Sequence, residues 1–230
     1  MSSKPTHQLP RILVLDVNET LLDVNTLRPF FERFFGDGDV LKEWFARTLL
    51  YSQTVTQTNN YVDFSTVARL ALEMTAKIHG VQCHEADTAS ILDAMKSLPA
   101  HPEVPGALQR LRQDGFRLVT LTNSSQSVAE AQMHSADLAH LCERIFSVDA
   151  VRKFKPHPEP YHYVAKQLNV KTSEMVMIAA HPWDLMGAKA AGLEVGFVKR
   201  PGASWFALSP MPELSASTLD ELATRLITRE

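Results

Sequence analysis

The sequence is poor in cysteine and has no long hydrophobic run. Its 230 residues include two cysteines, Cys83 and Cys142, which are too few for a disulfide framework and lack the spacing of a metal site. Apolar runs such as Ile12–Leu15 and Met175–Ala180 are far shorter than the roughly 20 residues that span a bilayer. Residues 1–10 are polar and predict no secretory signal. We therefore expect a cytoplasmic protein with reduced thiols.

An excess of charge of one sign is also lacking. Lys and Arg total 23 and Asp and Glu total 26, so the formal net charge is −3. A chain this close to balance has no general attraction to nucleic acid or to an anionic membrane. Hydrophobic residues make up 45% and charged residues 21%, which is typical of a globular fold. We expect an enzyme or a binding module for a small molecule, with neither nucleic acid nor membrane as a partner.

What is present is an alternation of short apolar runs and helical patterns. Strands are predicted at Ile12–Leu15, Phe116–Leu121, Ile145–Val148, Glu174–Ala180 and Val195–Val198. Helices are predicted at Pro105–Gln113, Ser125–Ala136, Pro158–Leu168 and Trp183–Ala191, and a last one begins near Thr218. Strands that are apolar throughout are typical of parallel sheets covered on both faces. The fold class is therefore predicted to be α/β, with a doubly wound parallel sheet.

One long segment interrupts this alternation. Between residues 23 and 98, apolar residues recur at helical spacing and no strand pattern is present. The segment is rich in aromatic residues, which a small helical unit needs to build its own core. We predict a core domain of residues 1–22 and 99–230, split by a helical insert of residues 23–98.

Polar side chains stand where the predicted strands end. Asp16 follows the first strand, Thr122 the second, and Lys155 and Asp184 lie in later strand-to-helix segments. In open parallel sheets, ligands bind beyond the carboxyl ends of the strands. A carboxylate, a hydroxyl, an ammonium group and a second carboxylate at one edge suit nucleophilic attack by a carboxylate. Asp16 would attack, Lys155 would keep it ionised, and Asp184 would hold Lys155 in place.

These residues resemble those of a known family. The segments Leu15–Leu22, Leu121–Ser124, Lys155–Tyr161 and Ala180–Gly192 are similar, in this order, to the four motifs of the haloacid dehalogenase superfamily. The resemblance implies a Rossmann-like core, a mobile helical cap formed by residues 23–98, and a covalent intermediate on Asp16.

Two positions favour one branch of that superfamily. Phosphatase members carry a second Asp where Asn18 stands, and an Mg²⁺-binding Asp where His181 stands. Asn cannot shuttle a proton, and His is a poor ligand for Mg²⁺. The sequence instead resembles the type II 2-haloacid dehalogenases, which need no metal and no cofactor. Two alternatives stay open: a phosphatase for a small phosphate ester, and a non-catalytic binding protein on the same fold.

The resemblance also implies roles for individual residues. Asp16 would displace halide from C2, and water would then hydrolyse the ester. Thr20, Thr122 and Asn123 would orient Asp16 and the carboxylate of a small anionic substrate. Lys155 would balance charge beside Asp184. Further residues expected to contact the substrate are Asn18, Tyr161 and Trp183. Members of this branch are often dimers, so the resemblance allows a homodimer and leaves the oligomeric state open.

The sequence departs from this branch in the insert and at the fourth motif. The cap arginine of the dehalogenases has Phe45 at its position, with Arg47 two residues further on and Arg28 as a weaker alternative. A two-residue offset is about 200° around a helix. Arg47 therefore faces the same pocket as Phe45 only if the alignment shifts, and both residues are kept as candidate substrate contacts.

At the fourth motif, His181 stands where the dehalogenases carry Asn, and Ala179 where they carry Ser. His181 has two interpretations: a hydrogen-bonded structural residue, or the base that activates the hydrolytic water, with Asp184 fixing its tautomer.

Overall fold

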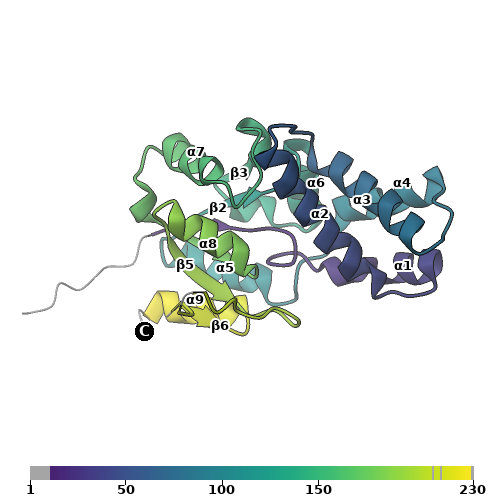
Figure 1. Ribbon diagram of the computed structural model, residues 1–230. Coiled ribbons are helices and arrows are strands. Elements are labelled where there is room, and N and C mark those ends of the chain that lie inside the picture. Colours follow the sequence, from purple (N-terminus) through teal and green to yellow (C-terminus); the bar gives the residue numbers. More distant parts are fainter. Residues whose placement is uncertain (1–10, 209, 213, 229–230) are drawn as a thin grey trace, which may run out of the picture.

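The protein is a parallel sheet flanked by helices, described by a computed structural model over residues 11–208, 210–212 and 214–228 (Figure 1). All adjacent strands run parallel, in the order β3-β2-β1-β4-β5-β6. The strands are β1 (Ile12–Leu15), β2 (Arg117–Thr122), β3 (Arg144–Ser147), β4 (Met175–Ala179), β5 (Glu194–Val198) and β6 (Ser215–Ala216). This confirms the predicted doubly wound sheet. Strand β6 was not predicted, because two residues at a sheet edge carry no periodic pattern.

Helices cover both faces of this sheet. In Figure 1, α7 and α8 lie in front of the strands, and α5 and α6 lie behind them. Helix α9 packs on α5, and α7 packs on α8. The helices are α5 (Val104–Gln113), α6 (Gln126–Ser135), α7 (Pro158–Leu168), α8 (Pro182–Ala190) and α9 (Leu219–Thr228). Burial on both faces explains why β1 and β4 are apolar at every position.

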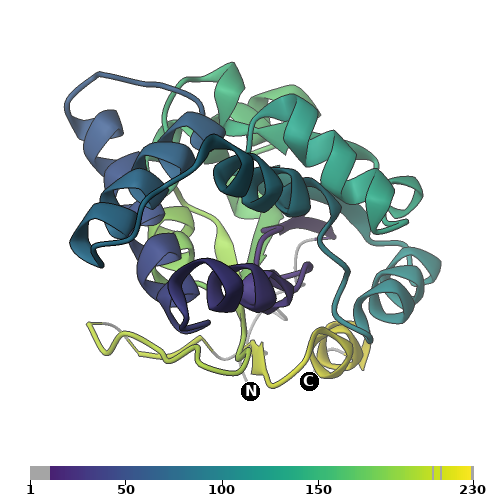
Figure 2. The ribbon, with the colours of Figure 1, turned by 90° about the vertical axis from the view of Figure 1, so that its right-hand side faces the viewer.

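The segment after β1 is helical. Its helices are η1 (Val24–Leu27), α1 (Arg28–Phe35), α2 (Val40–Gln57), α3 (Phe64–Ile78), α4 (Glu85–Ala94) and η2 (Met95–Ser97). Figure 2 looks onto α1–α4, which lie together on one side of the molecule. Trp44 of α2 is fully buried, and its indole N–H donates to the Ala68 carbonyl oxygen of α3 at 2.8 Å. Its ring lies 5.2 Å from that of Phe31, so aromatic residues form the core of this segment.

The two connections to this segment lie side by side. The Asp23 N–H donates to the Pro99 carbonyl oxygen, and the His101 N–H donates to the Leu21 carbonyl oxygen, both at 2.9 Å. The chain thus leaves and re-enters the sheet-bearing part at one place, as an inserted unit does. The division into a core of 1–22 and 99–230 and a cap of 23–98 stays a prediction that this geometry supports. Residues 1–10, and with them the predicted absence of a signal, lie outside the described residues.

Among the residues that the structure describes, no helix is both long and apolar enough to cross a membrane.

Helix α8 approaches the loop before α7 closely at one glycine. A Cβ atom at Gly187 would lie 2.5 Å from Pro156 Cβ, 2.6 Å from the Pro156 carbonyl oxygen and 2.8 Å from the Tyr161 hydroxyl. Backbone cannot yield as a flexible side chain can, so this position needs glycine. The contact sets the distance between α8 and the loop that carries Lys155.

Substituting this glycine tests that packing. Gly187→Ala is expected to lower the free energy of unfolding by about 1–3 kcal/mol, because the added methyl overpacks against backbone. Gly106→Ala, in the exposed first turn of α5 with open space around it, is the matched control. It is expected to leave stability unchanged or slightly raised. Chemical denaturation of both variants measures the difference, and equal stability would contradict the close approach.

Candidate active site

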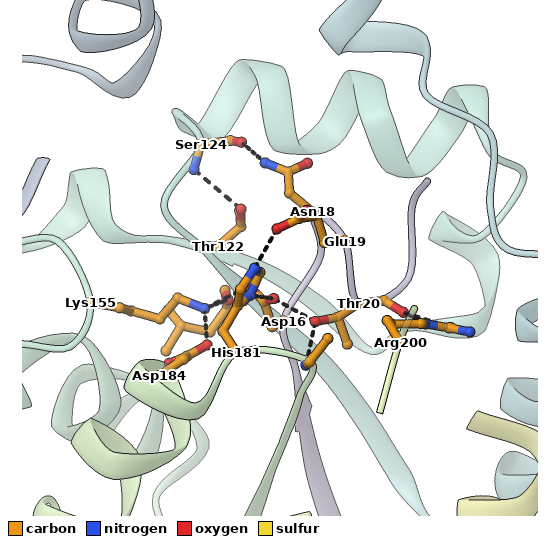
Figure 3. A network of polar contacts seen from close by, with 12 residues as sticks. Asp16, Asn18, Glu19, Thr20, Thr122, Ser124, Lys155, His181, Asp184 and Arg200 are labelled. Carbon is orange, nitrogen blue, oxygen red and sulfur yellow. Dashed lines mark hydrogen bonds and ion pairs between the residues drawn. The ribbon is translucent and has the colours of Figure 1, made fainter. Parts of the chain in front are cut away.

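The predicted polar residues meet beyond the carboxyl ends of the central strands (Figure 3). Asp16 follows β1 directly, Thr122 ends β2, and Asp184 lies in the first turn of α8. Lys155 lies in the loop between η4 (Val148–Ala150) and α7. Parallel pairing of β1 with both β2 and β4 brings these segments to one edge.

Lys155 is the centre of the cluster. Its side chain is fully buried, and Nζ lies 2.8 Å from Asp16 Oδ1, 2.6 Å from Asp184 Oδ2 and 2.8 Å from the Leu121 carbonyl oxygen. An ammonium group has three N–H donors, so every one of them is used. The Asn123 Oδ1 also accepts from the backbone N–H of Lys155 at 2.9 Å, which fixes the loop.

The two carboxylate oxygens of Asp16 have different partners. Oδ1 accepts from Lys155, whereas Oδ2 accepts from the Thr20 hydroxyl at 2.6 Å and lies 3.0 Å from His181 Nδ1. The Thr20 hydroxyl in turn accepts from the Ala180 N–H at 2.9 Å. Thr20 therefore ties the carboxylate to the end of β4 and sets its rotation.

This environment keeps Asp16 ionised. Burial alone raises the pKa of Asp16, but the charges and hydrogen bonds of Lys155 and His181 outweigh it and hold the pKa well below its usual range. Burial lowers the pKa of Lys155, and the charges of Asp16 and Asp184 outweigh that effect and raise it. Asp16 is thus a carboxylate with little exposure, as a nucleophile requires.

Asp184 and Tyr161 complete the surroundings of Lys155. The Tyr161 hydroxyl donates to Asp184 Oδ1 at 2.6 Å, and both side chains are fully buried. Burial, followed by the charge of Asp184, raises the pKa of Tyr161 well above its usual value, so the phenol stays protonated. Both oxygens of Asp184 therefore accept from a fixed donor.

His181 is held by two carboxylates. Its Nδ1 faces Asp16 Oδ2 at 3.0 Å, and its Nε2 faces Glu19 Oε2 at 2.7 Å. The expectation that Asp184 fixes its tautomer is corrected, because Asp184 is turned to Lys155 and Tyr161 instead. Glu19 was not predicted as a site residue: its contact joins positions 162 residues apart and leaves no local pattern.

The charge of this histidine follows from its partners. Burial lowers the pKa of His181, but the hydrogen bonds and charges of Asp16 and Glu19 outweigh it and raise the pKa to about 10. The ring is thus an imidazolium at neutral pH, and both N–H groups donate. In the resting state it cannot serve as a base, because it already carries its second proton.

Asn18 and Thr122 also have hydrogen-bond partners within the fold. The Asn18 amide donates to Ser124 Oγ at 3.2 Å and accepts from Gln132 Nε2 at 3.0 Å. The Thr122 hydroxyl accepts from the Ser124 N–H at 3.2 Å, and no hydrogen bond to Asp16 is found for it among the described contacts. These hydrogen bonds stabilise the loops around Asp16. Contact of Asn18 or Thr122 with a substrate stays a prediction.

The mouth of the site lies between the loop after β1, helix α2 and the loop after β5. A cavity of about 210 Å³ is lined by Phe45 and Leu41 of α2, and a second one of about 470 Å³ is lined by His181 and Arg200. Three residues line both: Glu19, Asn25 and Lys42. The Trp183 ring lies against the His181 ring in a tilted arrangement, with 5.2 Å between the ring centroids. Phe45 thus lines a cavity beside Glu19, and its contact with a substrate stays a prediction.

The structure places the two candidate arginines elsewhere. Arg47 pairs with Glu43 and donates to Thr75 Oγ1 at 3.2 Å, so it faces α3 and not the cavities. The physical reason is the 100° turn per residue of a helix, which puts position 47 on another face than Phe45. Arg28 pairs with Asp39 at 2.6 Å on the surface. The cation that lines the mouth from α2 is Lys42.

Comparison with known proteins gives consistent similarities. Residues 10–192 match the haloacid dehalogenase-like hydrolase family. Haloacetate dehalogenase H-2 of Moraxella sp. (strain B) is 28% identical over 212 residues, covering 91% of this chain and 95% of that protein. An (S)-2-haloacid dehalogenase of Xanthobacter autotrophicus is 30% identical over 192 residues, covering 83% of this chain and 75% of that protein.

A solved structure is similar over nearly the whole chain. It is the L-2-haloacid dehalogenase from Xanthobacter autotrophicus with chloropropionic acid covalently bound. It matches with a TM-score of 0.88 and 25% identity, covering 95% of this chain and 98% of that one.

Removing the central ammonium group is expected to be costly. Lys155→Met leaves the Asp16 and Asp184 carboxylates buried without their shared cation. Breaking one partner of such a buried ion pair lowers the free energy of unfolding by about 3–5 kcal/mol. The control Lys189→Met changes an exposed lysine of α8 and is expected to have little effect. Denaturant unfolding checks both, and a Lys155 variant as stable as the control would contradict the described cluster.

The raised pKa of His181 predicts a pH dependence of stability. A group whose pKa rises on folding from 6.5 to about 10 stabilises the protein fully below pH 6.5 and loses that contribution as the pH passes about 10. The unfolding free energy of the wild type minus that of His181→Asn is therefore expected to shrink over this range. His162→Asn, on the exposed face of α7, is expected to track the wild type. A difference that is constant with pH would contradict the imidazolium assignment.

Proposed function

The chain belongs to the haloacid dehalogenase-like hydrolases, and from that premise we propose that it removes halide from small 2-haloacids through an ester on Asp16. The observation that carries the proposal is the Asp16 carboxylate, which Lys155 and His181 keep ionised at the carboxyl end of β1. Relatives with related sequences are haloacetate and 2-haloacid dehalogenases. A similar structure holds chloropropionic acid covalently.

The first half-reaction needs only what the site contains. An Asp16 oxygen attacks C2 of the substrate, and the halide leaves with the bonding electron pair. Halide is a weak base and needs no proton on leaving, so no acid is required at Asn18. This agrees with the position of Asn18, whose amide is already hydrogen bonded to Ser124 and Gln132.

Phosphoryl transfer with Mg²⁺ fits the donor set less well. Mg²⁺ prefers oxygen ligands, and here an imidazolium stands against the nucleophile where a third carboxylate is needed. Both carboxylate oxygens of Asp184 already accept hydrogen bonds, one from Lys155 and one from Tyr161. Within the described parts of the chain, no group of three His, Cys, Asp or Glu residues is arranged to hold a metal ion. These features favour a metal-independent reaction.

The cavities support a small anionic substrate. The one beside α2 is about 210 Å³, and Phe45 and Leu41 make part of its wall apolar. Lys42, exposed at the rim of both cavities, supplies a cation that can attract a carboxylate as it enters. A short halogenated acid fits this cavity, with its carboxylate directed toward Lys42.

The proposal includes a cytoplasmic homodimer. Exposed apolar side chains on α2 and α3, among them Leu50, Leu70 and Ile78, support a protein contact through the insert. The free thiols of Cys83 and Cys142 support a reducing compartment.

A halide-release assay tests the proposal against its alternatives. The purified protein is expected to release chloride from 2-chloropropionate, equally with EDTA and with Mg²⁺, and to leave p-nitrophenyl phosphate intact. Asp16→Asn is expected to abolish release, because the amide is no nucleophile. Asp137→Asn, at a highly exposed position where asparagine tolerates the left-handed backbone, is the matched control. Phosphate release that requires Mg²⁺, or turnover of neither substrate, would refute the proposal.

A further inference from the structure

Glu19 occupies a backbone conformation that costs free energy. Its φ is 61°, in the left-handed region that favours glycine and is unfavourable for a glutamate. Such strain persists where surrounding contacts hold it, and it is frequent at functional sites. The contact here is the 2.7 Å pair with His181 Nε2. The strained backbone of Glu19 therefore places its carboxylate against His181, the residue that contacts Asp16.

The charges around His181 define what this pair can do. The side chain of His181 is 13% exposed, and that of Glu19 is 38% exposed at the rim. Asp16 and Glu19 face the two ring nitrogens, and Trp183 covers the ring. Arg200 and Lys42 line the same cavity, and each is already paired with a carboxylate, Arg200 with Glu103 and Lys42 with Asp39. One of the two anions that hold the imidazolium is thus the nucleophile itself.

We propose that Glu19 and His181 form a charge-switched pair, which holds Asp16 as an anion in the resting enzyme and accepts a proton from the hydrolytic water once Asp16 has become an ester. This inference rests on the proposed dehalogenation. Glu19 acts through His181 and is a positioning residue, whereas His181 is the catalytic residue of the second half-reaction.

The switch is the loss of the negative charge of Asp16. When an Asp16 oxygen bonds to C2 and the halide departs, the ester no longer attracts the imidazolium. Only Glu19 still stabilises the charged ring, so the ring loses its Nδ1 proton to solvent, while the Nε2–H stays hydrogen bonded to Glu19. That proton and the halide together are the acid HX that the overall reaction produces. Nδ1 is left as a free base beside the ester.

The second half-reaction returns the enzyme to its starting state. The oxygen of water attacks the Asp16 ester carbon, and one water proton moves to His181 Nδ1. The tetrahedral intermediate collapses with cleavage of the acyl C–O bond, and the proton passes from the ring to the leaving alkoxide to give the 2-hydroxyacid. The second water proton, left on the Asp16 carboxyl, moves to the ring. The carboxylate and the imidazolium are both restored.

The other polar groups of the cluster are less suited to this role. All three Lys155 donors are occupied, and Lys155 has no acceptor. Each Asp184 oxygen accepts from a fixed donor, and its charge holds Lys155 in place. His181 differs because the reaction itself frees one of its ring nitrogens.

Intact-protein mass spectrometry during turnover of 2-chloropropionate tests the pair. In Glu19→Gln and His181→Asn, we expect one equivalent of chloride to be released per site in a burst. The protein then remains alkylated, because loss of a positioned base slows hydrolysis about 100-fold or more. The controls Glu194→Gln and His162→Asn change exposed residues and should stay unalkylated at steady state, like the wild type. Glu19→Gly, in which glycine adopts φ 61° without penalty, keeps the test valid if the glutamine variant does not fold.

A pH profile separates positioning from a merely structural role. Removal of the Glu19 charge lowers the pKa of His181, so the rise of the hydrolysis rate with pH should shift to lower pH in Glu19→Gln while its maximum falls. Variants that hydrolyse the ester at the wild-type rate, or folded variants that are never alkylated, would overturn the charge-switched pair. A wild-type protein that releases no chloride would instead overturn the dehalogenation on which it rests.

Discussion

A buried ammonium group held between two carboxylates is the interaction on which the site depends. Lys155 satisfies all of its donors with Asp16, Asp184 and the Leu121 carbonyl oxygen, and it has no exposed surface. An isolated charge could not be buried in this way, whereas three charges with matched hydrogen bonds can. The same arrangement fixes the carboxylate that attacks. The same cluster therefore contributes to stability and to reactivity. It holds the segments that follow β1, β2 and β4 together.

The fold supplies this cluster from distant parts of the chain. Strand β1 sits between β2 and β4, so the residue after it meets the ends of both neighbours. The turn after β1 then carries two side chains that act at the same carboxylate: Thr20 directly, and Glu19 through His181. Arg200 closes the turn from the loop after β5 by donating to the Thr20 carbonyl oxygen at 2.8 Å. The inserted helices begin directly after this turn, and α2 lines a cavity together with Glu19.

Most of the sheet could be predicted, because apolar strands and helical spacing are local signals. The strand ends also indicated Asp16, Thr20, Lys155 and Asp184, whose order along the chain matches a known pattern; the structure brings them together, and their catalytic roles stay predictions. Glu19 could not be found in this way, because its role depends on a left-handed backbone and on a partner far along the chain. Arg47 was chosen by charge, and the helix turns it toward α3. The sequence pattern does not specify the direction in which a side chain points, or its contacts with residues far along the chain.

The central claim is that Asp16 forms a covalent ester that water then hydrolyses at the Asp16 carbon. A single turnover of 2-chloropropionate in ¹⁸O-labelled water, followed by digestion and mass spectrometry, tests it directly. The account predicts that the label enters the carboxylate of Asp16 and that the 2-hydroxyacid formed in this turnover is unlabelled at its new hydroxyl. Label in the hydroxyl, with an unlabelled Asp16 peptide from an enzyme that turns over, would contradict it.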